Sequence, residues 1–164
     1  MLREKINENI KKAMQEKNEL LLLVLRGVNA VIHNKEIEKR TKLSKSEKDI
    51  KKLEELSKLT EEEVLEAISS EAKKRKEAII EFEKGGRKDL VDKEEKELEI
   101  LKKYLPEQMN EKQIREEVKR IIDEVGATGT KDTGKVMAAI MPKLKGKAEG
   151  SLVNKTVNEL LSNL

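Results

Sequence analysis

Apolar residues recur along this chain at the three- to four-residue spacing of amphipathic helices. Leu2, Ile6, Ile10 and Met14 give the first example, and they predict a helix over residues 2–16. No segment alternates apolar and polar residues over a convincing length, so strands are not expected. The pattern therefore predicts an all-α fold, although 42% of the residues are charged and 36% are hydrophobic.

Two segments of contrasting composition follow the first helix. Residues 20–25 are six successive apolar residues. Such a run covers nearly the whole circumference of a helix, so it is expected to be buried on several sides at the centre of an N-terminal bundle. Residues 35–59 are dense in lysine and glutamate, with weak periodicity and no proline or glycine. We expect them to form a charged extension that is partly helical and mobile.

Helix start and stop signals organise the remainder of the first hundred residues. Thr60 and Glu63 have the form of a capping box, which opens a helix that ends at Gly85-Gly86. Another helix is expected from Leu90 until Pro106, because proline disfavours helical geometry in the residue before it. The signals predict an N-terminal domain of about four helices over residues 1–106.

The remaining residues, 107–164, are expected to form a three-helix tail domain. Residues 110–113 (Asn-Glu-Lys-Gln) repeat the capping-box form, and the helix that they open is closed by Gly126. Asp132 is the predicted N-cap of the second tail helix, and Ser151 is the predicted N-cap of the third.

The composition excludes several kinds of site. The chain has no cysteine and one histidine, so it offers no disulfide, no thiol nucleophile and no cysteine-ligated metal. His33 lies among apolar residues and is expected at a core or boundary position. No catalytic residue, metal site or cofactor is predicted. The longest apolar run is far shorter than the roughly 20 residues that span a bilayer, so we expect no membrane partner and a cytoplasmic location.

Positive charge is concentrated at the C-terminal end. The whole chain carries a net charge of +3, and residues 126–164 contain six lysines and three acidic residues. Within this region, residues 143–151 combine lysines with two glycines, and the next helix begins with unpaired amide groups. Cations beside free helix amides favour a bound anion such as an RNA phosphate. The alternative is a solvated connection whose glycines only make the turn.

Two other patterns have simpler explanations. Residues 129–135 match G-x-x-x-x-G-K, but Val136 replaces the Ser or Thr of a phosphate-binding loop and no buried strand precedes it. We interpret this segment as an interhelical loop. Residues 73–76 (Lys-Lys-Arg-Lys) are flanked by glutamates at helical spacing, which predicts a solvated charged face. With one Phe, one Tyr and no Trp, base stacking on aromatic side chains is not expected to contribute.

The chain resembles the YqeY family of small bacterial proteins. The resemblance rests on Arg87-Lys-Asp-Leu-Val, Tyr104-Leu-Pro-Glu-Gln, Glu124-Val-Gly-Ala, Gly134-Lys-Val-Met and Pro142-Lys-Leu-Lys-Gly-Lys-Ala-Glu-Gly-Ser. The second domain of that family is similar to the tail domain of the GatB subunit of Asp/Glu-tRNA amidotransferase. The resemblance implies a non-catalytic accessory module associated with tRNA-dependent amidation or aminoacylation. The ATP-binding and amidase portions that would support carbon–nitrogen ligase activity with glutamine as amide donor are absent.

The resemblance also implies a site and partners. Its candidate RNA-backbone contacts, with the residues that shape the loop, are Lys135, Lys143, Lys145, Gly146, Lys147, Gly150, Ser151 and Lys155. The implied partners are tRNA and a subunit of an amidotransferase or aminoacyl-tRNA synthetase. The alternative is a helical adaptor with no RNA role, in which residues 20–25 or 35–59 dock a protein.

Overall fold

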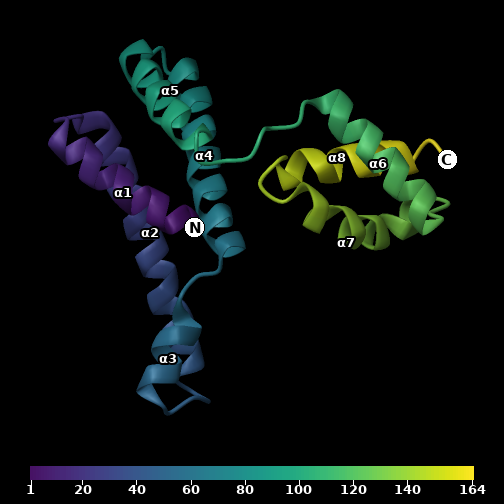
Figure 1. Ribbon diagram of the computed structural model, residues 1–164. Coiled ribbons are helices and arrows are strands. Elements are labelled where there is room, and N and C mark those ends of the chain that lie inside the picture. The colour runs from purple at the N-terminus through teal and green to yellow at the C-terminus, as the bar shows by residue number, and fades with distance from the viewer. The chain divides into compact units, whose positions relative to one another are not determined.

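The computed structural model describes all residues, 1–164, as eight α-helices, one short 3₁₀ helix and no strand (Figure 1). The all-α prediction is confirmed. Contacts divide the chain into two compact parts, which we call unit 1 (Met1–Tyr104) and unit 2 (Leu105–Leu164). This division falls close to the boundary that was expected after residue 106. No helix has both the length and the apolar character needed to cross a membrane.

Unit 1 is built around its second helix. Its helices are α1 (Leu2–Gln15), α2 (Glu19–Leu43), α3 (Ile50–Ser57), α4 (Glu61–Lys84) and α5 (Lys88–Lys102). The long helix α2 contacts each of the other four, while α4 and α5 pack on each other. The unit has five helices rather than about four because α3 forms within the charged segment 35–59.

The apolar run on α2 packs mainly on one side of the helix. Val24, Leu25, Val28 and Ile32 are buried, and they follow the helical spacing expected of a core-facing stripe. Leu23 is 57% exposed, so the expectation that residues 20–25 are buried on several sides is wrong at this position. The buried face of α2 is the centre of the unit 1 core.

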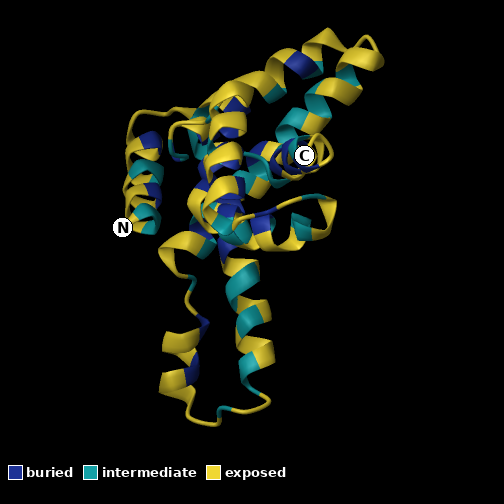
Figure 2. Cartoon of the chain, turned by 90° about the vertical axis from the view of Figure 1, so that its right-hand side faces the viewer, coloured by how far each residue is buried: buried dark blue, intermediate teal, exposed yellow.

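The charged segment 35–59 is the end of a helical hairpin. Helix α2 continues past the core to Leu43 and the chain returns as α3, which buries only Leu53 and Ser57 (Figure 2). His33 lies where α2 leaves the core, and it is exposed. Its predicted core or boundary position is therefore wrong, because its apolar neighbours in sequence point to a different side of the helix.

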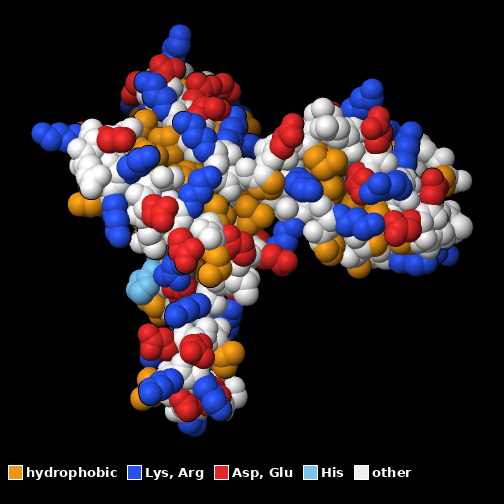
Figure 3. Space-filling model, in the orientation of Figure 1, with side chains coloured by type: hydrophobic (Ala, Val, Ile, Leu, Met, Phe, Trp, Pro, Cys, Tyr) orange, Lys and Arg blue, Asp and Glu red, His pale blue; other side chains and the backbone are white.

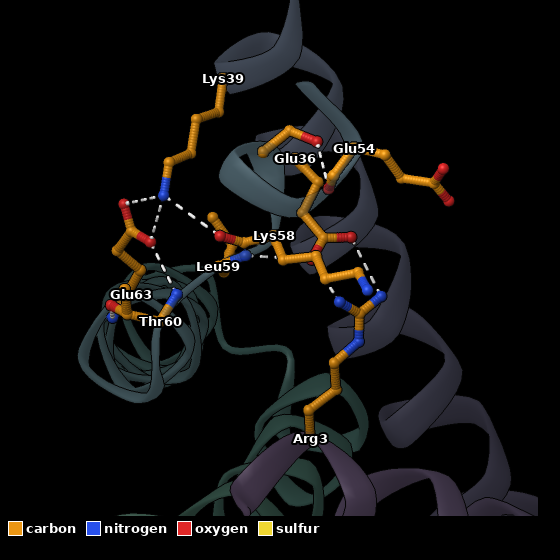
Figure 4. A network of polar contacts seen from close by, with 9 residues as sticks. Arg3, Glu36, Lys39, Glu54, Lys58, Leu59, Thr60 and Glu63 are labelled. Carbon is orange, nitrogen blue, oxygen red and sulfur yellow. Dashed lines mark hydrogen bonds and ion pairs between the residues drawn. The ribbon is translucent and has the colours of Figure 1, made fainter. Parts of the chain in front are cut away.

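A polar network fixes the base of this hairpin (Figure 4). The Glu36 carboxylate on α2 accepts a hydrogen bond from the Nη2 of Arg3 at 3.0 Å. The same carboxylate accepts one from the backbone N–H of Leu59 at 3.1 Å, just before α4 begins. Glu36 thereby joins α1, α2 and the connection between α3 and α4.

Lys39 and Glu63 form the second part of the network. The Nζ of Lys39 donates to the Glu63 carboxylate at 2.8 and 3.0 Å and to the Lys58 carbonyl at 3.2 Å. Glu63 also accepts from the backbone N–H of Thr60 at 2.7 Å, and the Thr60 hydroxyl accepts from the N–H of Glu63. The predicted capping box is confirmed. The hydrogen bond from Lys39, followed by the one from Thr60, lowers the pKa of Glu63 below 4.5.

This lowered pKa predicts a pH-dependent effect of Glu63→Gln. Glutamine keeps the capping acceptor but removes the charge, so the loss of stability at neutral pH is expected to be about 0.5–1 kcal/mol. The contribution of the Glu63 carboxylate is complete above its unfolded pKa and is lost as pH falls through its lower folded pKa. The difference between the thermal unfolding midpoints of variant and wild type should therefore be larger at pH 7 than at pH 3. Glu95→Gln, at an exposed position on α5, is the control and should match wild type more closely at pH 7.

A partly buried ion-pair cluster joins α4 to α5. The Nη1 of Arg75 lies 3.0 Å from the Glu94 carboxylate, and its Nη2 lies 3.0 Å from that of Glu97. Glu97 is only 3% exposed. The solvated face predicted for residues 73–76 is therefore wrong for Arg75, whose side chain reaches the neighbouring helix. Lys74 does lie on the surface, where it pairs with a glutamate of its own helix.

The last residue of unit 1 is anchored to the first helix. The Tyr104 hydroxyl accepts a hydrogen bond from the Asn9 side chain at 2.7 Å. The Lys5 ammonium lies 5.7 Å from the centre of the tyrosine ring, within the range of a cation–π contact. Tyr104 is 8% exposed, so this ring closes the core of unit 1 at its end.

Unit 2 is a three-helix bundle with its own core. Its elements are α6 (Glu111–Val125), the 3₁₀ helix η1 (Thr130–Asp132), α7 (Thr133–Leu144) and α8 (Gly150–Leu161). The three α-helices contact one another in every pairing. The fully buried positions lie on one stripe of each helix, and the largest are Ile114, Ile121, Ile140 and Leu161.

The predicted boundaries of α6 are confirmed, while the cap predicted for α7 is not. Asn110 and Gln113 form the capping box at the start of α6, and Gly126 ends it in the left-handed conformation, with φ of 63°. Asp132 precedes α7 but does not bond its amides. Its carboxylate accepts instead from the backbone N–H of Thr128 at 2.9 Å. Asp132 therefore closes the loop before α7.

Candidate nucleic-acid interface

The connection between α7 and α8 is a tight loop anchored to the segment that precedes α6. Gly146 has φ of 73°, a conformation that glycine adopts without strain. Its carbonyl accepts a hydrogen bond from the Gln108 side chain at 2.7 Å, and the carbonyl of Lys147 accepts one from the N–H of Met109 at 2.8 Å. Sequence reasoning missed these two anchors, since no local pattern links residues almost forty positions apart.

Gly150 allows α8 to begin close to α7. A Cβ at this position would lie 3.3 Å from the terminal methyl of Met141. Helix α8 begins at Gly150 after the N-cap Glu149, and no side chain caps it. The prediction that Ser151 is the N-cap is therefore wrong, since this exposed residue already lies in the first turn.

The predicted lysines occupy three separate places on unit 2. Lys143, Lys145 and Lys147 lie together at the end of α7 and in the loop. Lys135 lies in the first turn of α7, eight residues from Lys143 and about 12 Å away along the helix axis. Lys155 projects from the middle of α8. The structure thus groups three of the five lysines with Gly146 and Gly150 at the loop.

Lys143, Lys155 and Lys135 each approach an oxygen atom of the same unit. The Nζ of Lys143 lies 3.0 Å from the Glu124 carboxylate, and that of Lys155 lies 4.0 Å from Glu159. All four side chains are at least 43% exposed, so each pair is worth little and can be exchanged for another anion. Lys135 donates to the Val125 carbonyl at 2.5 Å, where it satisfies the C-terminal end of α6.

The other two lysines differ in exposure. Lys147 is exposed, and Lys145 is half-buried at the C-cap of α7. Positive and negative side chains are interspersed over the face of unit 2 shown in Figure 3. The candidate interface is therefore a local group of ammonium groups around one loop within a surface of mixed charge.

Sequence reasoning also missed a charged hollow between α6 and α8. Lys112 and Arg115 on α6 line it together with Lys155 of α8, beside the carboxylates of Glu111 and Glu159, and its volume is about 280 Å³. The two α6 residues are three positions apart, so they lie on the same side of the helix. The three-residue spacing of these two cations was the signal in the sequence that could have indicated the hollow. The acidic residues around them, however, are those of an ordinary solvated helix.

Neither a metal-binding cluster nor a phosphate-binding loop is found in the structure. No group of three or more His, Asp or Glu side chains is arranged to hold a metal ion. Residues 129–135 form the 3₁₀ helix and the start of α7, and no strand precedes them. The interpretation of this segment as an interhelical connection holds for residues 129–132, whereas residues 133–135 belong to α7.

Comparison with known proteins gives the family. The model of the Yqey-like protein family matches residues 3–161. The chain belongs to the YqeY-like family. A relative from Pyrenophora tritici-repentis is named "Altered inheritance of mitochondria protein 41, mitochondrial" and is 29% identical over 160 residues, which cover 96% of this chain and 79% of the relative.

Proteins with the same name occur in two other fungi. The relative from Lachancea thermotolerans is 35% identical over 61% of this chain and 46% of its own length. The relative from Kluyveromyces lactis is 34% identical over 60% of this chain and 45% of its own length. This YqeY-like chain thus matches less than half of these two proteins. Neither the family description nor the names of these relatives state a catalytic activity.

The comparisons correct two expectations. The cytoplasmic location is overturned by the relatives, because all three are named as mitochondrial proteins. The resemblance was drawn to small bacterial proteins, whereas these relatives are fungal.

Proposed function

We propose that this YqeY-like protein is a non-catalytic accessory module that binds tRNA through unit 2 and serves a tRNA-dependent amidotransferase or aminoacylation system. The observation that carries the proposal is the group of Lys143, Lys145 and Lys147 around a loop held by two hydrogen bonds from the segment before α6. A fixed loop presents ammonium groups to a phosphate backbone without first having to be ordered. The resemblance of the second half to the GatB tail domain supports the choice of tRNA.

The ion pair at the loop is weak enough for an RNA phosphate to replace its carboxylate. Lys143 is paired with a carboxylate that is 59% exposed, and such a pair is easily replaced by a phosphate. The same weakness makes binding sensitive to salt, because the affinity depends on counterions released from the RNA. Preference among RNAs would come from shape rather than from reading of bases.

The test is titration of tRNA at several salt concentrations. Replacing Lys143, Lys145 and Lys147 with alanine is expected to weaken binding about tenfold or more at low salt, and to reduce the slope of log affinity against log salt by about 2–3. The matched control replaces Lys42, Lys45 and Lys51, three exposed lysines of the unit 1 hairpin, and should leave both quantities near wild type. Equal affinity and slope for both triple variants would remove the loop from the function.

A second candidate is a protein-binding adaptor. It is favoured by three exposed apolar side chains on the unit 1 hairpin, those of Ile37, Ile50 and Leu56. Under this alternative, a tagged protein would recover a polypeptide partner in the presence of nuclease. Replacement of Ile50 and Leu56 with serine would abolish that recovery, whereas the unit 2 lysine variants would leave it intact.

A further inference from the structure

A polar groove runs between α6 and α8 in unit 2. Two adjoining hollows, of about 280 and 590 Å³, share Arg115, Lys155 and Glu159 in their walls. Lys112 lines the first hollow, one turn before Arg115. Three cations from two helices, with the carboxylates of Glu111 and Glu159 beside them, therefore line a space that is open to solvent and large enough for a phosphate group.

A carboxylate already lies between two of these cations. One oxygen of Glu159 is 3.5 Å from the Nη1 of Arg115, and the other is 4.0 Å from the Nζ of Lys155. Both separations exceed those of a good charge-assisted hydrogen bond, and all three side chains are at least 45% exposed. The Glu159 carboxylate thus occupies an anion position between the two cations, and its interactions with both are weak.

Unit 2 lacks the aromatic side chains on which unpaired bases stack. The only tyrosine and the only phenylalanine of the chain, Tyr104 and Phe82, both belong to unit 1. Proteins that bind single strands stack the bases on aromatic side chains, which this groove cannot do. Double-helical RNA keeps its bases stacked internally and presents phosphates and 2′-hydroxyls, which suit cations and polar groups.

We propose that the α6–α8 groove binds the phosphate backbone of double-helical RNA, and that a phosphate displaces the Glu159 carboxylate from Arg115 and Lys155. This inference rests on the proposed function and extends it to a second contact surface and a structural class of RNA. The groove and the α7–α8 loop then contact separate phosphates of one ligand. Glu159 lowers the affinity by competing with the RNA for the same cations.

The experiment uses the full chain, a 16-base-pair RNA hairpin and an oligouridine of equal charge. Glu159→Gln is expected to bind the hairpin about fivefold more tightly at low salt, since one repulsive charge about 4 Å from the phosphate is removed. Arg115→Gln should weaken hairpin binding about tenfold, and Arg115→Lys should restore part of it. Glu116→Gln, an exposed residue of α6 outside the groove, is the matched control and should change the affinity less than Glu159→Gln. Circular dichroism checks that each variant is folded.

The outcomes separate this inference from the function on which it rests. If the α7–α8 loop variant loses binding while Glu159→Gln and Arg115→Gln match wild type, the groove is not a contact surface, although unit 2 still binds RNA. If oligouridine binds as tightly as the hairpin, the assignment to double-helical RNA is wrong. If neither RNA nor tRNA binds the wild-type chain at low salt, the proposed function itself fails.

Discussion

Replacing Arg75 with alanine is expected to lower the free energy of unfolding of unit 1 by about 3–5 kcal/mol. Its guanidinium bonds both Glu94 and Glu97 across the interface of α4 and α5. Without it, the Glu97 carboxylate, whose side chain is 4% exposed, loses its compensating cation in a poorly hydrated site. Urea denaturation followed by far-ultraviolet circular dichroism measures the loss.

Two further variants test whether this loss comes from the ion pairs of Arg75 with Glu94 and Glu97. Arg87→Ala removes an arginine whose partner Asp89 is 64% exposed, so it should lower the free energy of unfolding much less than Arg75→Ala does. Replacing Arg75 and Glu97 together with methionine should recover much of the loss, because no unpaired charge then remains at position 97. A cost for Arg75→Ala equal to that for Arg87→Ala would show that the α4–α5 cluster contributes little.

Replacing Ile121 with alanine is expected to remove a large part of the free energy of unfolding of unit 2. Ile121 is fully buried among the three helices of that unit, and such a truncation costs about 2–5 kcal/mol. A domain of this size has a total stability of only about 3–9 kcal/mol. Amide hydrogen exchange should therefore accelerate throughout α6, α7 and α8 while the protection of unit 1 persists.

The control for this variant lies in the same unit. Leu164 is 70% exposed, so Leu164→Ala should leave the exchange rates of unit 2 within about twofold of wild type. Unchanged protection in Ile121→Ala would mean that the core between the three helices is not the source of unit 2 stability. Faster exchange in both units at once would mean that they unfold together.

The elements that the sequence predicted well are those governed by neighbours in the chain. The ends of α6 follow from Asn110, Gln113 and Gly126, whose bonds and backbone geometry involve residues within one turn. The capping box at Thr60 has the same local origin. Apolar spacing likewise identified the buried faces, since burial repeats with the helical period.

The failures involve pairings between helices. Arg75 has a glutamate, Glu71, four residues earlier on its own helix, yet its partners lie on α5. Glu159 approaches Arg115 from another helix, and Gln108 bonds a loop almost forty residues later. Periodicity indicates which side of a helix is buried but not which helix packs there. The loop lysines and Lys155 were predictable from the sequence, whereas Lys112 and Arg115 of the groove were not.

The position of Tyr104 allows unit 1 to be followed by intrinsic fluorescence. It is the only tyrosine, there is no tryptophan, and its ring is packed beside α1 at the end of unit 1. Intrinsic ultraviolet emission therefore originates in unit 1, while the three-helix bundle contributes none. The unfolding of unit 1 can be followed by this emission. The unfolding of unit 2 is then obtained by subtracting the unit 1 contribution from the total helix signal, without attaching a dye to the protein.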